Sequence, residues 1–177
     1  MRHLILHVGH EKTGTSYIQS VLASNAEFIK TLGVVYPFEK SFAYAQEGKI
    51  SSGNGKLLDE ETFQVAEGFK TLLSSEIFFQ SLSVDDNLEH KVLRKSDRLE
   101  VILYTRDVME WISSSWGQDV KRAGTVESFS ESLLKKRAAQ YQIVLWWIEA
   151  SKKYNFELSV RNYTKRRDNL IENFFNL

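Results

Sequence analysis

Two glycines, a lysine and three hydroxyl side chains occur within eight residues near the start of the chain, in the segment Gly9-His10-Glu11-Lys12-Thr13-Gly14-Thr15-Ser16. A short apolar run precedes this segment, and residues with helical spacing follow it. A glycine-rich turn between a strand and a helix directs backbone N–H groups and the positive end of the helix dipole at one point. The glycines let the backbone approach an anion closely, and Lys12 adds a mobile positive charge. The segment therefore predicts a phosphate-binding loop.

The position of the lysine distinguishes this loop from the ATPase pattern G-x-x-x-x-G-K-[ST]. Both glycines and the final Ser16 match, but Thr15 stands where the ATPase lysine would reach the β- and γ-phosphates. The lysine of this chain lies at position 12, before the second glycine. This displacement argues against an ordinary ATPase, and a chance glycine-rich turn is the non-functional alternative.

The segment from His7 to Gln19, H-V-G-H-E-K-T-G-T-S-Y-I-Q, resembles the 5′-phosphosulfate loop of sulfotransferases that use 3′-phosphoadenosine 5′-phosphosulfate (PAPS), especially those acting on bacterial and glycan substrates. In that family the loop lysine contacts the 5′-phosphate and the bridging oxygen. The resemblance implies an enzyme that moves a sulfuryl group from PAPS to a hydroxyl of a carbohydrate, releasing 3′-phosphoadenosine 5′-phosphate (PAP). It also implies a nucleotide site made of Gly9, Lys12, Thr13, Gly14, Thr15 and Ser16.

The same resemblance implies a second anion site for the 3′-phosphate of PAPS. The family uses an arginine at the end of a later strand and a serine eight residues further on, which here are Arg106 and Ser114. An arginine suits a phosphate because its planar guanidinium donates two parallel hydrogen bonds. Ser113 and Ser115 flank the serine, so its register could differ by one. The rival interpretation is a Walker-B-like strand with Asp107 near Mg²⁺, although Asp107 is also an ordinary helix-start residue.

Sulfuryl transfer depends on positioning and charge stabilisation, and a base must take the proton of the acceptor hydroxyl. Lys12 would neutralise the charge on the bridging oxygen as it leaves. Glu76 is the first candidate base, because the residues L-S-S-E that end at Glu76 resemble a segment after a strand in bacterial relatives. His10, inside the loop, is the second candidate, and Glu11 is the third. A surface glutamate or a structural salt-bridge partner is the alternative for Glu76, and loop packing is the alternative for His10.

Short apolar runs alternate with longer segments of helical spacing along the chain. Strands are expected at residues 3–8, 34–36, 100–105 and 156–160, with a helix-to-strand transition within 72–79. Helices are expected at residues 15–23, 59–73, 84–95, 107–120, 126–154 and 168–175. Residues 49–56 predict a surface loop, either a flexible connection or a lid.

This alternation predicts an α/β fold, a single domain over residues 1–177 in three layers, with a central parallel sheet between helices. The resemblance implies the P-loop NTPase-like topology of sulfotransferases. In such sheets the ligand lies beyond the carboxyl ends of the strands, where the loop and Arg106 both fall.

Charge and composition limit the classes of partner. The 23 Lys and Arg residues balance the 23 Asp and Glu residues, which predicts no nucleic-acid partner. The chain has no cysteine, and no zinc-ligand spacing occurs, so no metal site is predicted. Because neither a signal peptide nor a membrane span is evident, we expect a cytoplasmic protein. Lys121, Arg122 and the basic run at 135–137 could attract an anionic glycan, with a solvated helix face as the alternative for the run.

The carboxyl end of the sequence leaves the completeness of the nucleotide site open. The chain ends at Leu177, soon after a predicted helix, whereas many of the sulfotransferases that it resembles continue with a basic loop over the 3′-phosphate. We expect either a truncated chain or a minimal member. Two alternative functions therefore stay open, which are a small-molecule kinase or NTPase and a non-catalytic nucleotide-binding module.

Overall fold

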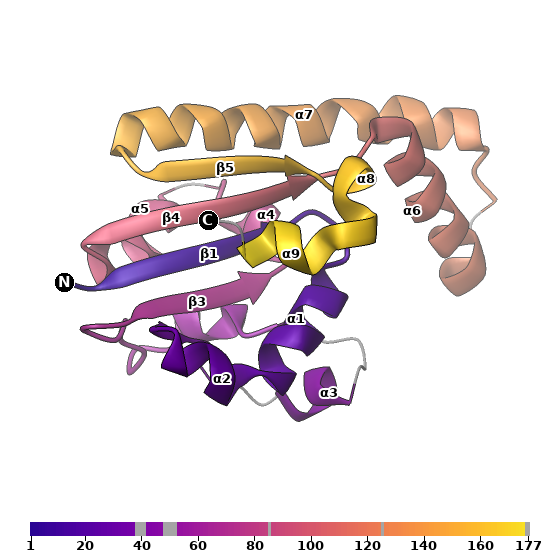
Figure 1. Ribbon diagram of the computed structural model, residues 1–177. Coiled ribbons are helices and arrows are strands. Elements are labelled where there is room, and N and C mark those ends of the chain that lie inside the picture. The colour runs from indigo at the N-terminus through magenta and orange to yellow at the C-terminus, as the bar shows by residue number, and fades with distance from the viewer. Residues whose placement is uncertain (38–41, 48–52, 85, 125, 176–177) are drawn as a thin grey trace.

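The computed structural model describes residues 1–37, 42–47, 53–84, 86–124 and 126–175, with the backbone alone for residues 42 and 134–140. Its centre is a five-stranded sheet in the order β2-β3-β1-β4-β5, in which every pairing is parallel (Figure 1). The strands are β1 (His3–Gly9), β2 (Val34–Val35), β3 (Lys70–Ser75), β4 (Arg98–Thr105) and β5 (Glu157–Asn162). The predicted parallel α/β architecture is confirmed.

Helices cover both faces of the sheet and so complete the three layers (Figure 1). One face packs against α4 (Phe78–Ser81), α5 (Asn87–Lys91) and α7 (Phe129–Tyr154). The other packs against α1 (Thr15–Ser24), α2 (Ala26–Thr31), α3 (Phe42–Gln46) and α9 (Leu170–Phe175). Because β1, β3 and β4 lie between these layers, nearly all of their residues are buried, on both faces of the sheet.

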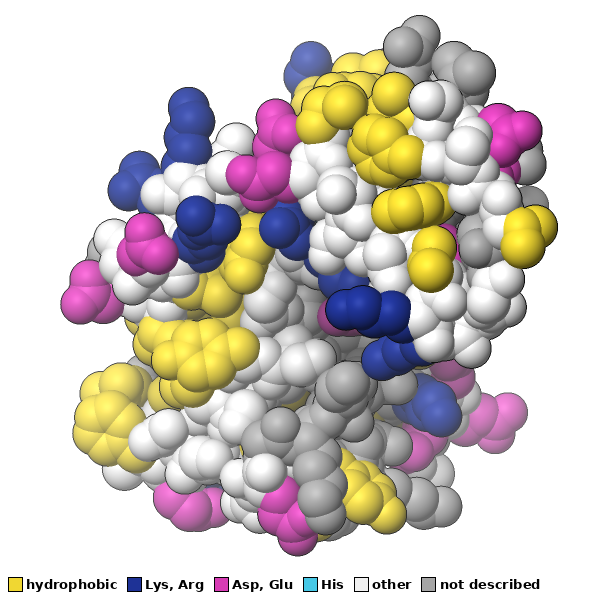
Figure 2. All heavy atoms as spheres, turned by 90° about the vertical axis from the view of Figure 1, so that its right-hand side faces the viewer, with side chains coloured by type: hydrophobic (Ala, Val, Ile, Leu, Met, Phe, Trp, Pro, Cys, Tyr) yellow, Lys and Arg dark blue, Asp and Glu magenta, His cyan; other side chains and the backbone are white. Residues whose placement is uncertain are grey.

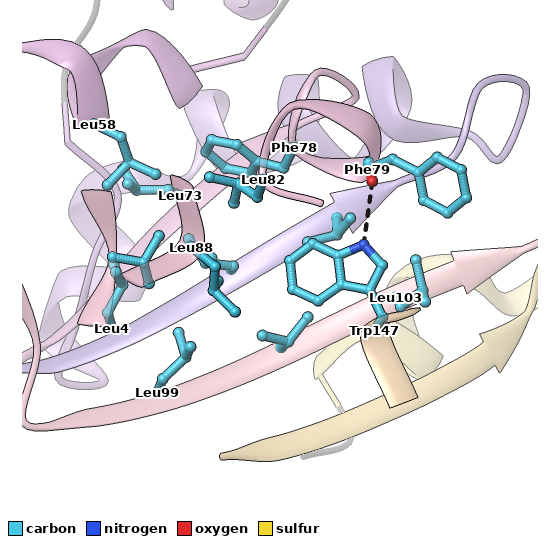
Figure 3. Packing of buried hydrophobic residues seen from close by; sticks show 14 of the residues in the cluster. Leu4, Leu58, Leu73, Phe78, Phe79, Leu82, Leu88, Leu99, Leu103 and Trp147 are labelled. Carbon is cyan, nitrogen blue, oxygen red and sulfur yellow. Dashed lines mark hydrogen bonds between the residues drawn. The ribbon is translucent and has the colours of Figure 1, made fainter. Parts of the chain in front are cut away.

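Trp147 joins the long helix α7 to the sheet. Its side chain is fully buried, and its indole N–H donates to the carbonyl of Phe79 at 3.2 Å (Figure 3). Leu4, Leu88 and Leu103 belong to the same core cluster. The neighbouring residue Trp146 is only partly buried and packs against the same cluster.

The helix predicted at residues 59–73 is wrong. A short 3-10 helix covers Gly55–Asp59, residues 60–69 form no helix, and β3 begins at Lys70. Six consecutive residues of β3 pair with β1, from His3↔Lys70 to Val8↔Ser75. This pairing outweighs the local helical spacing of the apolar residues. The order within 72–79 is also reversed, because the strand comes first and the helix α4 follows.

The surface loop predicted at residues 49–56 is wrong at its carboxyl end, and its residues 49–52 lie outside the described parts of the chain. Gly53, Asn54 and Gly55 are buried. The Asn54 side chain accepts from the backbone N–H of Ser74 at 2.8 Å and donates to the carbonyl of Leu72. These bonds fasten the segment to the edge of β3.

Two other predicted helices differ in extent. The helix expected at 84–95 divides into α5 and a 3-10 helix at Leu93–Lys95. The last helix begins at Leu170, after the short α8 (Tyr163–Arg166) and a 3-10 helix at Arg167–Asn169. The side chains of the basic run at 135–137 lie outside the description. Within the described residues, no helix is both long and apolar enough to cross a membrane.

Candidate functional site

The predicted phosphate loop lies between the end of β1 and the start of α1, in the strand-to-helix position that the sequence indicated. Lys12 and Gly14 both have left-handed backbone conformations, with φ angles of 64° and 74°. Gly9 makes the closest approach, because a Cβ atom at this position would lie 1.9 Å from the Thr15 Oγ1 atom. Only glycine fits such a contact without displacement, so Gly9 allows Thr15 to pack directly against the backbone of the loop.

The buried hydroxyls of the loop hold its conformation. Thr13 donates to the backbone carbonyl of His10, and its Oγ1 atom lies 3.5 Å from that of Thr15. Both threonines are almost fully buried, whereas Ser16 is only partly buried. Thr13 therefore shapes the loop from within, while Thr15 and Ser16 also reach the cavity next to it.

A cavity of about 360 Å³ opens at the carboxyl ends of β1 and β3, against α6 (Val108–Ala123). Figure 2 looks onto this end of the sheet, where Lys and Arg side chains gather around the middle of the face. The loop supplies one side of the cavity, and the residue after β3 and the helix α6 supply others. The lining residues are Glu11, Lys12, Gly14, Thr15, Ser16, Glu76, Gln118 and Arg122.

Glu76 directly follows β3, as predicted, and its carboxylate lines the cavity together with Lys12. Partial burial raises the pKa of Glu76, the nearby Glu11 carboxylate raises it further, and Lys12 opposes the rise. A carboxylate of raised pKa is a better base than an exposed one. Among the described residues no salt bridge to Glu76 occurs, although the charge of Lys12 acts on it, so the role of Glu76 stays a prediction.

Arg106 lies directly after β4 and is fixed by three contacts. Its guanidinium donates to the backbone carbonyl of Lys12 at 3.1 Å and to Glu110 at 3.3 Å, and it stacks over the ring of Tyr163 at 5.6 Å. The side chain is 18% exposed. The structure thus brings the predicted second anion-binding residue against the phosphate loop.

Ser114 lies on α6, half-buried, between the exposed Ser113 and the buried Ser115. Residues four apart share one face of a helix, so Ser114 lies on the same face as Gln118 and Arg122. The last two line the cavity. Neither Ser114 nor Arg106 lines the cavity itself, so the assignment of Ser114 to the second anion site stays a prediction.

His10 lies behind the loop rather than in the cavity wall. Its ring contacts the edges of Phe79 and Trp111, each at 4.9 Å between centroids, and its Nδ1 atom lies 2.6 Å from the carbonyl of Glu11. Burial, with a smaller contribution from Arg106, lowers the pKa of His10 to about 4. These contacts fit the loop-packing interpretation of His10.

Asp107 is the N-cap residue of α6. Its carboxylate accepts hydrogen bonds from the backbone N–H groups of Met109 and Glu110, at 3.0 and 3.2 Å. This N-cap role matches the ordinary alternative for Asp107. Among the described residues, no cluster of histidine and carboxylate side chains could hold a metal ion.

The carboxyl-terminal helices cover the loop, which the sequence did not predict. A Cβ atom at Gly14 would lie 2.7 Å from Leu170 and 2.9 Å from Tyr163. Figure 1 shows α8 and α9 crossing the ends of β1 and β4 beside the start of α1. Gln118 was also missed, and the signal that could have found it is its spacing of one helical turn from Ser114.

Comparison with known proteins identifies a solved structure with a similar fold. No protein-family model matches the sequence, and no curated protein matches it either. Among solved structures, a sulfotransferase from Alicyclobacillus acidocaldarius is similar, with a TM-score of 0.50 and 11% sequence identity. The match covers 97% of this chain and 77% of that one. The chain therefore has a sulfotransferase-like α/β fold.

Proposed function

We propose that this protein is a sulfotransferase that moves a sulfuryl group from PAPS to a hydroxyl of a carbohydrate. The observation that carries the proposal is the cavity at the strand ends, where the phosphate loop and the carboxylate of Glu76 line the same space. A loop for the donor and a base for the acceptor are the two parts that this reaction needs.

The loop residues fit the phosphosulfate end of the donor. Lys12 and the N-terminus of α1, which begins at Thr15, give positive charge beside the backbone N–H groups of the loop. Arg106, held against the loop by its bond to the Lys12 carbonyl, is the residue for the 3′-phosphate. Ser114 is its partner on α6.

Glu76 takes the proton of the acceptor hydroxyl in this proposal. The hydroxyl oxygen forms a bond to sulfur while the bond from sulfur to the bridging oxygen breaks. The electron pair of that bond stays on the oxygen of the 5′-phosphate, next to the ammonium group of Lys12. Lys12 thus stabilises charge that develops in the transition state, which is the largest contribution expected in such group transfers.

The kinase alternative lacks comparable support. Thr15 occupies the position of the ATPase lysine, and Asp107 caps α6 with both of its backbone contacts. Neither residue is arranged as an ATP- and Mg²⁺-dependent site requires.

Calorimetric titration tests the donor. PAP, ADP and ATP are each titrated with and without Mg²⁺. We expect PAP to bind without metal and ADP to bind more weakly, because it lacks the 3′-phosphate. Tighter binding of ATP with Mg²⁺ would favour the kinase alternative, and no binding of any nucleotide would favour the non-catalytic module. Transfer of labelled sulfate from PAPS to a saccharide then tests the reaction itself.

A further inference from the structure

The proposed donor does not account for the cavity wall that α6 contributes, so no ligand group is yet matched to it. Gln118 and Arg122 lie four residues apart, so their side chains emerge from the same face of the helix. The proposed donor contacts come from the phosphate loop, Arg106 and Ser114. The two residues further along α6 are therefore available to another molecule in the same cavity.

Gln118 carries an unsatisfied polar atom. Its Oε1 atom is buried and has no hydrogen-bond partner within the described part of the chain. A buried amide oxygen without a donor is unfavourable, and such atoms are uncommon in folded proteins. Because Gln118 also lines the cavity, rotation of its side chain brings the amide oxygen to a hydroxyl group of a bound molecule, which supplies the missing donor.

Arg122 places a positive charge in the same wall. It is exposed, in the last turn of α6, and no described carboxylate pairs with it. The guanidinium group binds carboxylates and sulfates through two parallel hydrogen bonds. Lys121, its neighbour in the sequence, is equally exposed but does not line the cavity.

Building on the proposed sulfuryl transfer, we propose that Gln118 and Arg122 form the acceptor subsite and that the acceptor is an acidic saccharide. Gln118 Oε1 accepts a hydrogen bond from a ring hydroxyl near the one that Glu76 deprotonates. Arg122 binds a carboxylate or sulfate group of the acceptor. The two contacts select an acceptor that is polyhydroxylated and anionic.

Matched variants separate these contacts. Arg122→Gln and Lys121→Gln each remove one exposed positive charge, but only the first removes it from the cavity wall. The probes are an unsulfated chondroitin tetrasaccharide, its sulfated counterpart and the neutral tetrasaccharide of N-acetylglucosamine. The measured quantity is the ratio of kcat/KM for each acidic probe to that for the neutral probe, with PAPS as donor.

We expect the native protein to prefer an acidic probe, and we expect Arg122→Gln to lower the ratio about tenfold, a typical effect of losing a charge-assisted hydrogen bond. Lys121→Gln should leave the ratio unchanged. An equal loss for the two acidic probes identifies the anion as a carboxylate, and a loss confined to the sulfated probe identifies it as a sulfate. An unchanged ratio in Arg122→Gln, or an equal loss in Lys121→Gln, overturns the subsite.

Gln118→Met gives an independent measurement. It removes the amide but keeps the length of the side chain, so we expect KM to rise for acidic and neutral probes alike. The melting temperature should stay the same or rise, because no intramolecular hydrogen bond is lost. A fall in melting temperature with unchanged KM would show a structural role and would contradict the proposal for Gln118.

Binding of PAP separates failure of the subsite from failure of the proposed function. Arg122→Gln and Gln118→Met should both bind PAP as the native protein does. If the native protein binds no PAP, the proposed transfer fails, and calorimetry with the acidic tetrasaccharides alone still tests the subsite through its dependence on Arg122. If PAP binds and the kcat/KM ratio between acidic and neutral saccharides does not depend on Arg122, only the proposed acceptor subsite is wrong.

Discussion

The guanidinium group of Arg106 donates a hydrogen bond to the backbone carbonyl of Lys12 at 3.1 Å and so ties the end of β4 to the phosphate loop. The two residues are 94 positions apart in the sequence. In the proposed function, Arg106 binds the 3′-phosphate and also holds the loop proposed for the 5′-phosphosulfate, so it couples the two proposed ends of the nucleotide site.

Arg106→Lys tests this coupling. Lysine keeps the charge but cannot form the planar two-bond contact, so we expect affinity for PAP to fall about tenfold or more. Affinity for adenosine 5′-phosphate, which lacks the 3′-phosphate, should fall less. Calorimetry with both nucleotides measures the difference. Arg167→Lys, an exposed change of the same kind, is the control, and an equal loss for both nucleotides would remove the 3′-phosphate from Arg106.

Lys12 tests charge and backbone conformation separately. Lys12→Ala and Lys12→Gly both remove the ammonium group, so both should weaken PAP binding and sulfate transfer. The φ angle of 64° suits glycine better than alanine. We expect the glycine variant to be more stable than the alanine variant by about 1 kcal/mol. Thermal unfolding measures this difference, and equal stability would show that the left-handed conformation carries no strain.

Glu76→Gln tests the base. Glutamine cannot accept the proton, so kcat should fall by about 10² to 10⁴ while PAP affinity stays nearly unchanged. A variant with native turnover would exclude Glu76 from this role.

The pH profile tests how Glu11 acts on Glu76. The base must be ionised, so activity should disappear as the pH falls through the raised pKa of Glu76. Glu11→Gln removes a like charge and lowers that pKa, which should move the acidic limb of the kcat profile to lower pH. An acidic limb that stays in place would show that the charge of Glu11 does not act on Glu76.

The sequence predicted the loop and the strands β1, β2, β4 and β5 because their signals are local. The apolar run before Gly9, the glycine spacing and the apolar run before Arg106 each mark a feature within about ten residues. The strand β3 was missed because it depends on pairing with β1, a contact between residues 67 positions apart at His7 and Ser74. Local signals also predicted which single residues directly follow a strand.

The cavity wall was harder to predict. The only local signal for Gln118 is its spacing of one helical turn from Ser114, and its importance follows from an oxygen that packing leaves buried and unpaired. The covering of Gly14 by Leu170 and Tyr163 likewise depends on how the end of the chain folds back over its start. Such features arise from tertiary contacts, which the local pattern of residues does not encode.

Gly9→Ala tests the close packing of the loop. A Cβ atom would overlap Thr15 Oγ1, so we expect a loss of about 1 to 3 kcal/mol in the free energy of unfolding. Gly117→Ala is the control, because a Cβ atom there meets no atom within 4 Å. That change, inside α6, should stabilise the protein by about 0.5 to 1 kcal/mol. Denaturant unfolding compares the two, and equal effects would contradict the close contact.

His7 gives the protein a predicted weakness to acid. Its side chain is fully buried, its Nδ1 atom lies 2.8 Å from Ser74 Oγ, and its ring meets the edges of Tyr104 and Phe174. Burial, with a smaller contribution from Arg161, lowers the pKa of His7 from 6.5 to about 3. As the pH falls, His7 therefore becomes protonated near pH 6.5 in the unfolded chain but only near pH 3 in the folded protein. Stability should fall as the pH drops between these values, by up to about 1.4 kcal/mol per pH unit from this group.

His7→Asn isolates this contribution. Asparagine keeps a polar atom near Ser74 but does not titrate, so its free energy of unfolding should depend less steeply on pH between 6 and about 4. The comparison uses the slope, because the substitution also changes packing. His90→Asn, an exposed change on α5, should keep the native slope. If His7→Asn keeps the native slope as well, the buried imidazole is not the group whose protonation opposes folding in acid.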